Sequence, residues 1–327
     1  MRKIILICLG LMLASTVFAM GTVPNGEPIV PTPTISWKNS VGMAGSADGQ
    51  FFSPKDVFVS VIGDISTGLG NLFVADSGNN RVQRLDQDGS FVYQFGGFGT
   101  SNGRFSNPTN LVVDFNYYIF VVDKDNSRVQ KFDNRGNFIK AWGSFGKENG
   151  QFQAPHGIAI DSWSTIYVAD TDNDRIQKFT SEGGFLSSFG GFGYGMGFFD
   201  SPRDIALDKN GYIYVADTGN NRVQKLDEDG RPIFAIGSSG KGPGQFYNPS
   251  GIAVDDKYLY VADTGNARIQ VFDKNGAFLA SYGRSGGMDG EFNNPQGICT
   301  GKTGSLFVAD TGNQRIVELK VTPQEEK

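Results

Sequence analysis

Six copies of one motif, each accompanied by four short apolar runs, predict that this 327-residue chain is an all-β protein, a six-bladed β-propeller of four-stranded antiparallel blades. In each copy an arginine follows an aspartate by five positions, and successive copies start about 47 residues apart. The copies read LFVADSGNNRVQRL, IFVVDKDNSRVQKF, IYVADTDNDRIQKF, IYVADTGNNRVQKL, LYVADTGNARIQVF and LFVADTGNQRIVEL.

The four strands of one blade can be read from residues 155–190. The runs GIAI, TIYVA, RIQKF and GFLSSF are rich in β-branched and aromatic residues, and Asp, Asn and Gly separate them. These features indicate an antiparallel meander, and no helical period competes with them. A second motif, Phe-x-x-Pro, comes before each first strand and keeps the same phase, with prolines at Pro54, Pro108, Pro155, Pro202, Pro249 and Pro295.

The first 33 residues have the character of an export signal and a linker. Two cations, an apolar run and the small-residue motif Val17-Phe18-Ala19 predict a signal peptide over residues 1–19, cleaved after Ala19. The run is too short to cross a bilayer, so we expect a periplasmic or secreted protein with no transmembrane span. Residues 20–33 contain four prolines and are expected to form a linker.

The two ends of the propeller, residues 34–320, are predicted to meet in one blade. The last repeat ends near Leu319 after only three strands, while Trp37 and Gly42 fit the spacing of a blade's outer strand. We therefore expect residues 34–41 to complete the sixth blade, which removes a free sheet edge. The polar tail is residues 321–327, and the propeller is expected to be monomeric.

Charge and cysteine content exclude some functions. The chain has 29 Lys and Arg residues and 34 Asp and Glu residues, and loss of Arg2 and Lys3 with the signal leaves 27 basic residues and a net charge of −7. Nucleic acid is therefore not an expected partner. After Cys8 is removed, Cys299 stands alone in an apolar stretch, where we expect a buried, unreactive thiol.

The repeated Asp and Arg are predicted to be structural. The segment from Asp76 to Asn80 has residues suited to a tight turn, and Arg81 would face Asp76 across the hairpin in a charge-assisted hydrogen bond. A catalytic group is unique within its site, whereas this pair recurs in every blade. The first repeat alone is longer, and the surplus between Val57 and Leu72 is read as an enlarged loop.

The two motifs, G-x-F-x-x-P and V-A-D-[ST]-x-N-x-R-[IV]-Q, resemble those of the NHL-repeat family over residues 35–320. The resemblance implies a six-bladed propeller with a central channel. It does not imply one activity, because propellers of this family serve as RNA-binding platforms, protein-binding modules, sensor domains and, in one case, a lyase.

Residues just after the repeat prolines should surround one mouth of that channel, where the polar departures from the repeat are Lys55, Asp56, Asn110, His156, Arg203 and Asp204. The amidating lyase of this family type places zinc-binding histidines here, and His156 matches one such position. Lys55 and Arg203 occupy comparable positions, and a catalytic zinc needs about three protein ligands. Because His156 is the only histidine, we expect no zinc site and a hydrogen-bonded channel mouth.

An enzyme of another kind remains as the alternative. Six-bladed lactonases and related hydrolases hold Ca²⁺ at the channel with carboxylates and amides, and Asp56, Asn110 and Asp204 are ligands of the right type. The positive charges of Lys55 and Arg203 oppose a bound cation. The preferred prediction has no cofactor, and the alternative has Ca²⁺ at these three residues.

The glycine-rich connections between blades carry the best signal for binding. Three consecutive connections have phenylalanine at the same place, Phe98, Phe145 and Phe192, and Tyr194 lies near the last. These rings either form an apolar patch for a partner or pack between blades. The sequence thus favours an exported, non-catalytic binding or scaffold propeller that presents loops to a protein, peptide or glycan.

Overall fold

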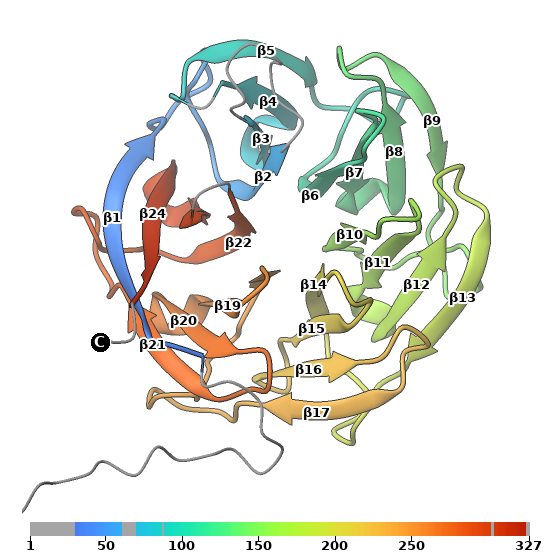
Figure 1. The fold of residues 1–327 in the computed structure, drawn as a ribbon. Coiled ribbons are helices and arrows are strands. Elements are labelled where there is room, and N and C mark those ends of the chain that lie inside the picture. Colours follow the sequence, from blue (N-terminus) through green and yellow to red (C-terminus); the bar gives the residue numbers. More distant parts are fainter. Residues whose placement is uncertain (1–29, 61–69, 87, 302–303, 325–327) are drawn as a thin grey trace, which may run out of the picture. The chain divides into compact units, whose positions relative to one another are not determined.

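The computed structural model describes residues 30–60, 70–86, 88–301 and 304–324. The predicted signal peptide, most of the linker, the end of the polar tail and the enlarged loop of the first repeat lie outside these residues. In the unit that begins at Pro31, the described residues form six four-stranded antiparallel sheets arranged as the blades of a ring (Figure 1). The predicted six-bladed propeller is confirmed.

The first three blades follow the chain from the channel outward. Blade 1 consists of β2 (Pro54–Ser60), β3 (Asn71–Asp76), β4 (Arg81–Leu85) and β5 (Phe91–Gly96). Blade 2 consists of β6 (Pro108–Val113), β7 (Ile119–Asp123), β8 (Arg128–Phe132) and β9 (Phe138–Trp142). Blade 3 consists of β10 (Ile158–Ile160), β11 (Ile166–Asp170), β12 (Arg175–Phe179) and β13 (Phe185–Gly190).

The last three blades keep this order, and the sixth takes its outer strand from the other end of the chain. Blade 4 consists of β14 (Pro202–Leu207), β15 (Ile213–Asp217), β16 (Arg222–Leu226) and β17 (Pro232–Ile236). Blade 5 consists of β18 (Gly251–Val254), β19 (Tyr258–Asp263), β20 (Arg268–Asp273) and β21 (Phe278–Tyr282). Blade 6 consists of β22 (Pro295–Thr300), β23 (Ser305–Asp310), β24 (Arg315–Pro323) and β1 (Pro33–Val41).

Closure of the ring through β1 is therefore as predicted. β1 lies antiparallel to β24, with Thr34 opposite Thr322 and Val41 opposite Ile316. The free edge that β24 would otherwise present is covered. Among the residues that the structure describes there is no long apolar helix of the kind that spans a bilayer.

The hydrophobic core lies between blades. One cluster joins Val112, Phe120 and Val122 of blade 2 to Phe152 and Val168 of blade 3, all of them buried. The phenylalanine of each Phe-x-x-Pro motif is completely buried, at Phe51, Phe105, Phe152, Phe199, Phe246 and Phe292. Because each sheet buries its faces against its neighbours, no blade has a core of its own.

The repeated aspartate is the centre of a buried hydrogen-bond network in each blade. In blade 3, Asp170 accepts hydrogen bonds from Arg175 Nε at 2.8 Å, Asn173 Nδ2 at 2.9 Å and Gln177 Nε2 at 3.0 Å. Its other oxygen accepts one from the backbone N–H of Gln153 at 2.8 Å. The predicted Asp–Arg contact is present in all six blades, at 2.6 to 2.8 Å. The network joins the hairpin to the connection that enters the blade.

We predict that Asp217→Ala lowers the free energy of unfolding by about 3–5 kcal/mol, because it leaves the partly buried guanidinium of Arg222 without its carboxylate. Urea titration followed by tryptophan fluorescence measures the loss. The control is Asp229→Ala, which removes an exposed carboxylate that contacts Arg231 at the surface and should leave the midpoint nearly unchanged. Equal midpoints for the two variants would contradict a structural role for the buried network.

We also predict that a chain starting after Val41 self-associates. Without β1, the backbone groups of β24 that now bond to it form an open edge, which templates pairing with other chains. Size-exclusion chromatography with light scattering should show oligomers or aggregates, while the chain starting at Val30 stays monomeric. A monomeric, folded shortened chain would show that β1 is dispensable.

Candidate functional site

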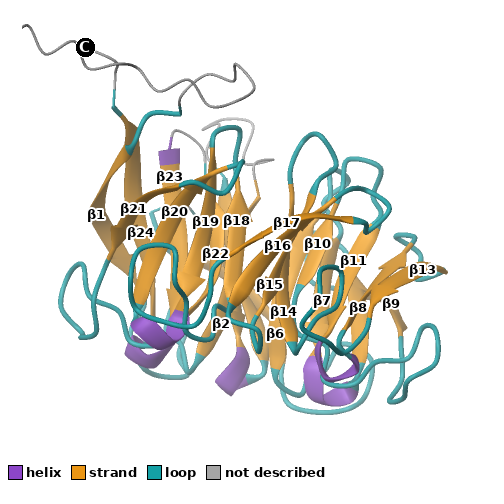
Figure 2. Cartoon of the chain, turned by 90° about the horizontal axis from the view of Figure 1, so that it is seen from below, coloured by secondary structure: helices purple, strands orange, loops and turns teal. Residues whose placement is uncertain are grey.

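The connections between blades and the turns between second and third strands lie on one face of the propeller, here called the loop face. In blade 3 the turn is the 3-10 helix η3 (Thr171–Asn173), and Asn173 Nδ2 donates to the carbonyl of Gly146 in the preceding connection at 2.9 Å. Figure 2 shows such 3-10 turns at the edge of the blades. The opposite face, here called the turn face, carries the turns between first and second strands, which begin at Asp114, Asp161, Asp208 and Asp255.

The predicted aromatic residues are exposed on the loop face. The exposed fractions are 77% for Phe98, 73% for Phe145, 63% for Phe192 and 73% for Tyr194. The backbone of each phenylalanine bridges to the buried phenylalanine of its own connection, as Phe98 does to Phe105. The backbone is therefore anchored while the rings point to solvent, and the rings do not pack between blades.

The connection from blade 3 to blade 4 is the most apolar of these loops. Phe192, Tyr194, Met196 and Phe198 alternate with glycines, and the rings of Phe192 and Tyr194 meet edge to face with centroids 5.8 Å apart. Arg222 holds the loop from within the blade, donating to the carbonyls of Tyr194 at 2.7 Å and Phe198 at 2.9 Å. The apolar side chains thus stand on an ordered backbone.

Asp56, Asn110 and Asp204 converge on the channel axis at the start of the inner strands. Asn110 Nδ2 donates to Asp204 Oδ1 at 3.1 Å, which links blades 2 and 4. Asp204 Oδ2 accepts from the N–H of Ile252 at 2.9 Å, and Asp56 Oδ2 accepts from that of Leu111 at 3.2 Å. All three side chains are buried, so they cross-link blades at the axis.

Glycines at the same position in the other three blades make this convergence possible. A Cβ at Gly297 would lie 2.2 Å from Asp56 Oδ1, and one at Gly157 would lie 2.8 Å from Asp204 Oδ1. A Cβ at Gly251 would lie 2.0 Å from the carbonyl oxygen of Gln296. The alternation of glycine and polar residues at this position therefore has a steric cause. Three blades lack a side chain, and this leaves room at the axis for the side chains of the other three.

Burial weakens the acidity of both carboxyl groups. It raises the pKa of Asp204 to about 7. The pKa of Asp56 is raised well above its usual value, first by burial and second by the charge of Asp204. At neutral pH the two groups together therefore hold less than two full negative charges.

The hydrogen bonds of these residues count against a calcium site. Ca²⁺ takes about six to eight oxygen ligands. Both oxygens of Asp204 already accept hydrogen bonds, and Asn110 directs its amide N–H toward Asp204. Within the described ranges no three His, Cys, Asp or Glu side chains are grouped to hold a metal ion.

Lys55, His156 and Arg203 lie at the same mouth. Lys55 and Arg203 directly precede the two acids, and each is half-buried. His156 is buried, and burial followed by the charges of Arg203 and Lys55 lowers the pKa of its ring well below the usual value. The structure brings all six candidate residues of the channel mouth to the axis, in a basic layer and an acidic layer.

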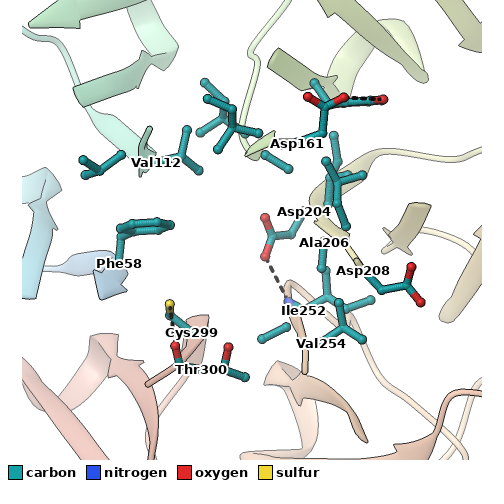
Figure 3. Close-up of a pocket in the computed structure, with 18 of the residues that line it drawn as sticks. Phe58, Val112, Asp161, Asp204, Ala206, Asp208, Ile252, Val254, Cys299 and Thr300 are labelled. Atoms are coloured by element: carbon teal, nitrogen blue, oxygen red, sulfur yellow. Dashed lines mark hydrogen bonds between the residues drawn. The ribbon is translucent and has the colours of Figure 1, made fainter. Parts of the chain in front are cut away.

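Beyond the acids the channel widens into a cavity of about 640 Å³ (Figure 3). Its wall is mainly apolar, with Phe58, Val112, Val254 and Cys299, and Asp204 lies at its inner end. As a whole residue Cys299 is partly buried, not fully buried as expected, and it lines the cavity. Burial raises the pKa of its thiol to about 12, so the group is a neutral thiol at physiological pH.

The cavity reaches the turn face, and sequence reasoning missed this opening. Its rim includes Trp163 and Phe115, which are 88% and 64% exposed. The signal was present in the turns DFNYY and DSWST, which carry Phe115 and Trp163 at the places of Lys209 and Asn210 in DKNGY of blade 4.

Comparison with known proteins identifies the repeat: the NHL repeat model matches residues 152–179, 199–226, 246–272 and 292–319, so blades 3 to 6 contain NHL repeats. Each match runs from the buried phenylalanine, or near it, to the third strand. A 72-residue stretch is 35% identical to "Protein brain tumor" of Drosophila melanogaster, which covers 22% of this chain and 6% of that protein. The matched stretch is thus a small part of that relative.

Solved structures with this fold have several functions. A streptogramin B lyase is 15% identical with a TM-score of 0.57, covering 89% of this chain and 98% of its own. An auxiliary nutrient binding protein from Bacteroides ovatus is 14% identical with a TM-score of 0.62, covering 90% and 78%. A gluconolactonase from Xanthomonas campestris is 12% identical with a TM-score of 0.60, covering 90% and 99%. At these identities the likeness establishes the fold alone.

We predict that Asp204 makes stability depend on pH. Its folded pKa of about 7 exceeds the unfolded value of 3.8, so the folded state keeps a proton that the unfolded state has lost between these values. The contribution of Asp204 to stability is therefore full below about pH 4 and falls as the pH rises to about 7. Asp204→Asn removes this decline, and should gain up to about 4 kcal/mol relative to wild type over that interval.

Urea midpoints of wild type and Asp204→Asn, measured from about pH 4 to pH 8, test this. Asn110 can turn its amide to keep a hydrogen bond to the substituted side chain. Asp289→Asn, at an exposed loop position, is the control and should follow wild type at every pH. A constant difference between wild type and Asp204→Asn would show that this carboxyl titrates normally.

Proposed function

We propose that this NHL-repeat propeller is an exported, non-catalytic binding protein whose loop face receives a protein, peptide or glycan partner. The observation that carries the proposal is the exposure of Phe98, Phe145 and Phe192 at one repeat position in consecutive connections. Exposed aromatic side chains grouped on an ordered surface are typical of partner sites.

The energetics favour binding at these rings. Burying one phenylalanine side chain stabilises a complex by about 1.5–3 kcal/mol. Arg128, Arg175 and Arg222 hold the backbone of the three loops through hydrogen bonds to their carbonyls, so little loop ordering opposes association. The other connections have Ala44, Ser239 and Ser285 at this position, so the exposed phenylalanines at it lie on consecutive connections only.

A second candidate function is small-molecule binding in the cavity that reaches the turn face. Its volume of about 640 Å³, its apolar wall and its carboxyl groups at the inner end have the character of a ligand pocket. Trp163 and Phe115 at the rim would contact such a ligand.

The alternative from the enzyme class is a calcium-dependent, lactonase-like hydrolase at the channel. The convergence of Asp56, Asn110 and Asp204 supports it. Their hydrogen bonds, their raised pKa values and the neighbouring Lys55 and Arg203 count against a bound cation. A binding role needs none of these residues to hold a metal.

We predict that the mature chain, tagged and recovered from its own envelope extract, retains a partner in the presence of EDTA. A triple variant, Phe98→Ser, Phe145→Ser and Phe192→Ser, should retain at least about tenfold less, since each lost ring removes more than about 1.4 kcal/mol. Quantitative mass spectrometry of the eluates measures the ratio.

The matched control is the double variant Phe115→Ser and Trp163→Ser, which removes equally exposed rings from the turn face. It should retain the partner as wild type does. Loss of the partner from this variant instead would move the binding site to the cavity. Stoichiometric calcium in the purified protein, with nothing retained, would favour the hydrolase.

A further inference from the structure

We infer that the centre of the loop face is a binding site for a small oxyanion, formed by Lys55, Lys124, His156 and Arg203. We expect the partner of the loop face to carry this oxyanion, as a carboxylate or a phosphate. Only this link to the partner rests on the proposed function; the anion site itself does not. The site lies on the side of Asp56 and Asp204 away from the cavity.

The four residues are departures from the repeat. After the proline, the other blades have the neutral residues Thr109, Ser250 and Gln296. After the repeated aspartate, every blade except blade 2 has a hydroxyl, which donates to the carbonyl of the next blade's proline; Thr218 does so to Pro249 at 2.7 Å. Lys124 replaces this hydroxyl in blade 2. The fold therefore does not require these charged groups at their positions.

The four residues lie close enough for their charges to act on one another, although three blades supply the inner-strand residues and the turn of blade 2 supplies Lys124. Burial first, and then the charges of Lys124 and Arg203, lower the pKa of Lys55 to about 8. Besides burial, the charges of Arg203, Lys55 and Lys124 all lower the pKa of His156. The acidic neighbours are Asp125, which acts on Lys55, and Asp172, which acts on Arg203.

Hydrogen-bonding capacity in this space is not used within the protein. Among the described residues, Lys55, Lys124 and Arg203 have no carboxylate within the 4.0 Å of an ion pair. Lys55 Nζ donates to Asn107 Oδ1 at 2.6 Å, while the half-buried guanidinium of Arg203 has no acceptor among those residues. His156 is 8% exposed, and its Nδ1 has no partner.

An oxyanion supplies what these groups lack. A guanidinium presents several N–H donors that match carboxylate or phosphate oxygens, and the ammonium groups add charge. Protonation of the His156 ring would let Nδ1, which has no partner in the protein, donate to the anion. Asp125 and Asp172 limit the excess positive charge, so the site suits one small anionic group and not a polyanion such as nucleic acid.

Anion binding should therefore be coupled to proton uptake. The three cations disfavour imidazolium, and a bound anion offsets them and raises the pKa of His156. Asp125 and Asp172 also act on the basic cluster, but they do so equally in the free and the anion-bound protein, so they do not cause the change in the pKa of His156. Affinity should accordingly rise as the pH falls through the pKa of the complexed His156.

His156 is the only histidine of the chain, which makes the test direct. The mature protein, with a tag that lacks histidine, is titrated with sodium acetate and separately with inorganic phosphate at constant ionic strength, while NMR follows the His156 ring. We expect a saturable shift with at least one anion, and a higher apparent pKa for the ring in its presence. The stronger of the two identifies the group as a carboxylate or a phosphate.

Arg203→Gln and, separately, Lys55→Gln should weaken anion binding at least tenfold. Lys147→Gln, at an exposed position on the same face, should leave it unchanged. Urea midpoints check that each variant is folded. No saturable shift with either anion, or equal binding by Arg203→Gln and Lys147→Gln, would overturn the inference.

Retention of the envelope partner by the same variants separates the two proposals. Loss with Arg203→Gln but not with Lys147→Gln supports the oxyanion on the partner. Equal retention of the partner by the two variants refutes the proposal that the partner carries the oxyanion, while the proposed binding function stands. Anion binding without any retained partner upholds the site and refutes the proposed function.

Discussion

One buried carboxylate per blade sets the geometry of the loop face. Asp170 and its equivalents lie at the end of the second strand with no exposure to solvent, and each accepts hydrogen bonds from both the hairpin and the incoming connection. The paired arginine extends this link, since Arg175 donates to the carbonyls of Glu148 and Gln151 in the connection. A glycine-rich loop that would otherwise sample many conformations is thereby held in one.

This constraint separates positions that maintain the fold from positions that can vary. The network uses side chains of the hairpin and backbone groups of the connection, so the exposed side chains of the connection are not needed to hold it. Phe98, Phe145 and Phe192 can point to solvent for that reason. The side chain of Arg203, which follows the repeat proline of blade 4, likewise makes no hydrogen bond within the described residues. Functional differences among blades can accumulate there without loss of stability.

The fold could be predicted from the sequence because the spacing of the repeats indicates the number of blades and the order of their strands. Spacing predicted six blades, and the match of Trp37 and Gly42 to an outer strand predicted the closure through β1. Spacing does not report what meets across the axis. The convergence of Asp56 with Asp204, the role of the intervening glycines and the approach of Lys124 to Lys55 depend on contacts between blades far apart in the chain. The exposure of the phenylalanines was undecided for a related reason, since the repeat fixes their backbone but not their rings.

The channel is divided into layers of different character, and this division makes its two ends independent. Lys55, Lys124 and Arg203 form the layer at the loop face, and their charges disfavour entry of a cation. Asp56, Asn110 and Asp204 fill the next layer, where an anion would meet buried carboxyl groups. The basic layer does not set the pKa of either acid, because burial dominates both shifts and no lysine or arginine contributes to them. A ligand of the loop face and a ligand of the cavity would therefore bind at separate sites, with the cross-linked acids between them.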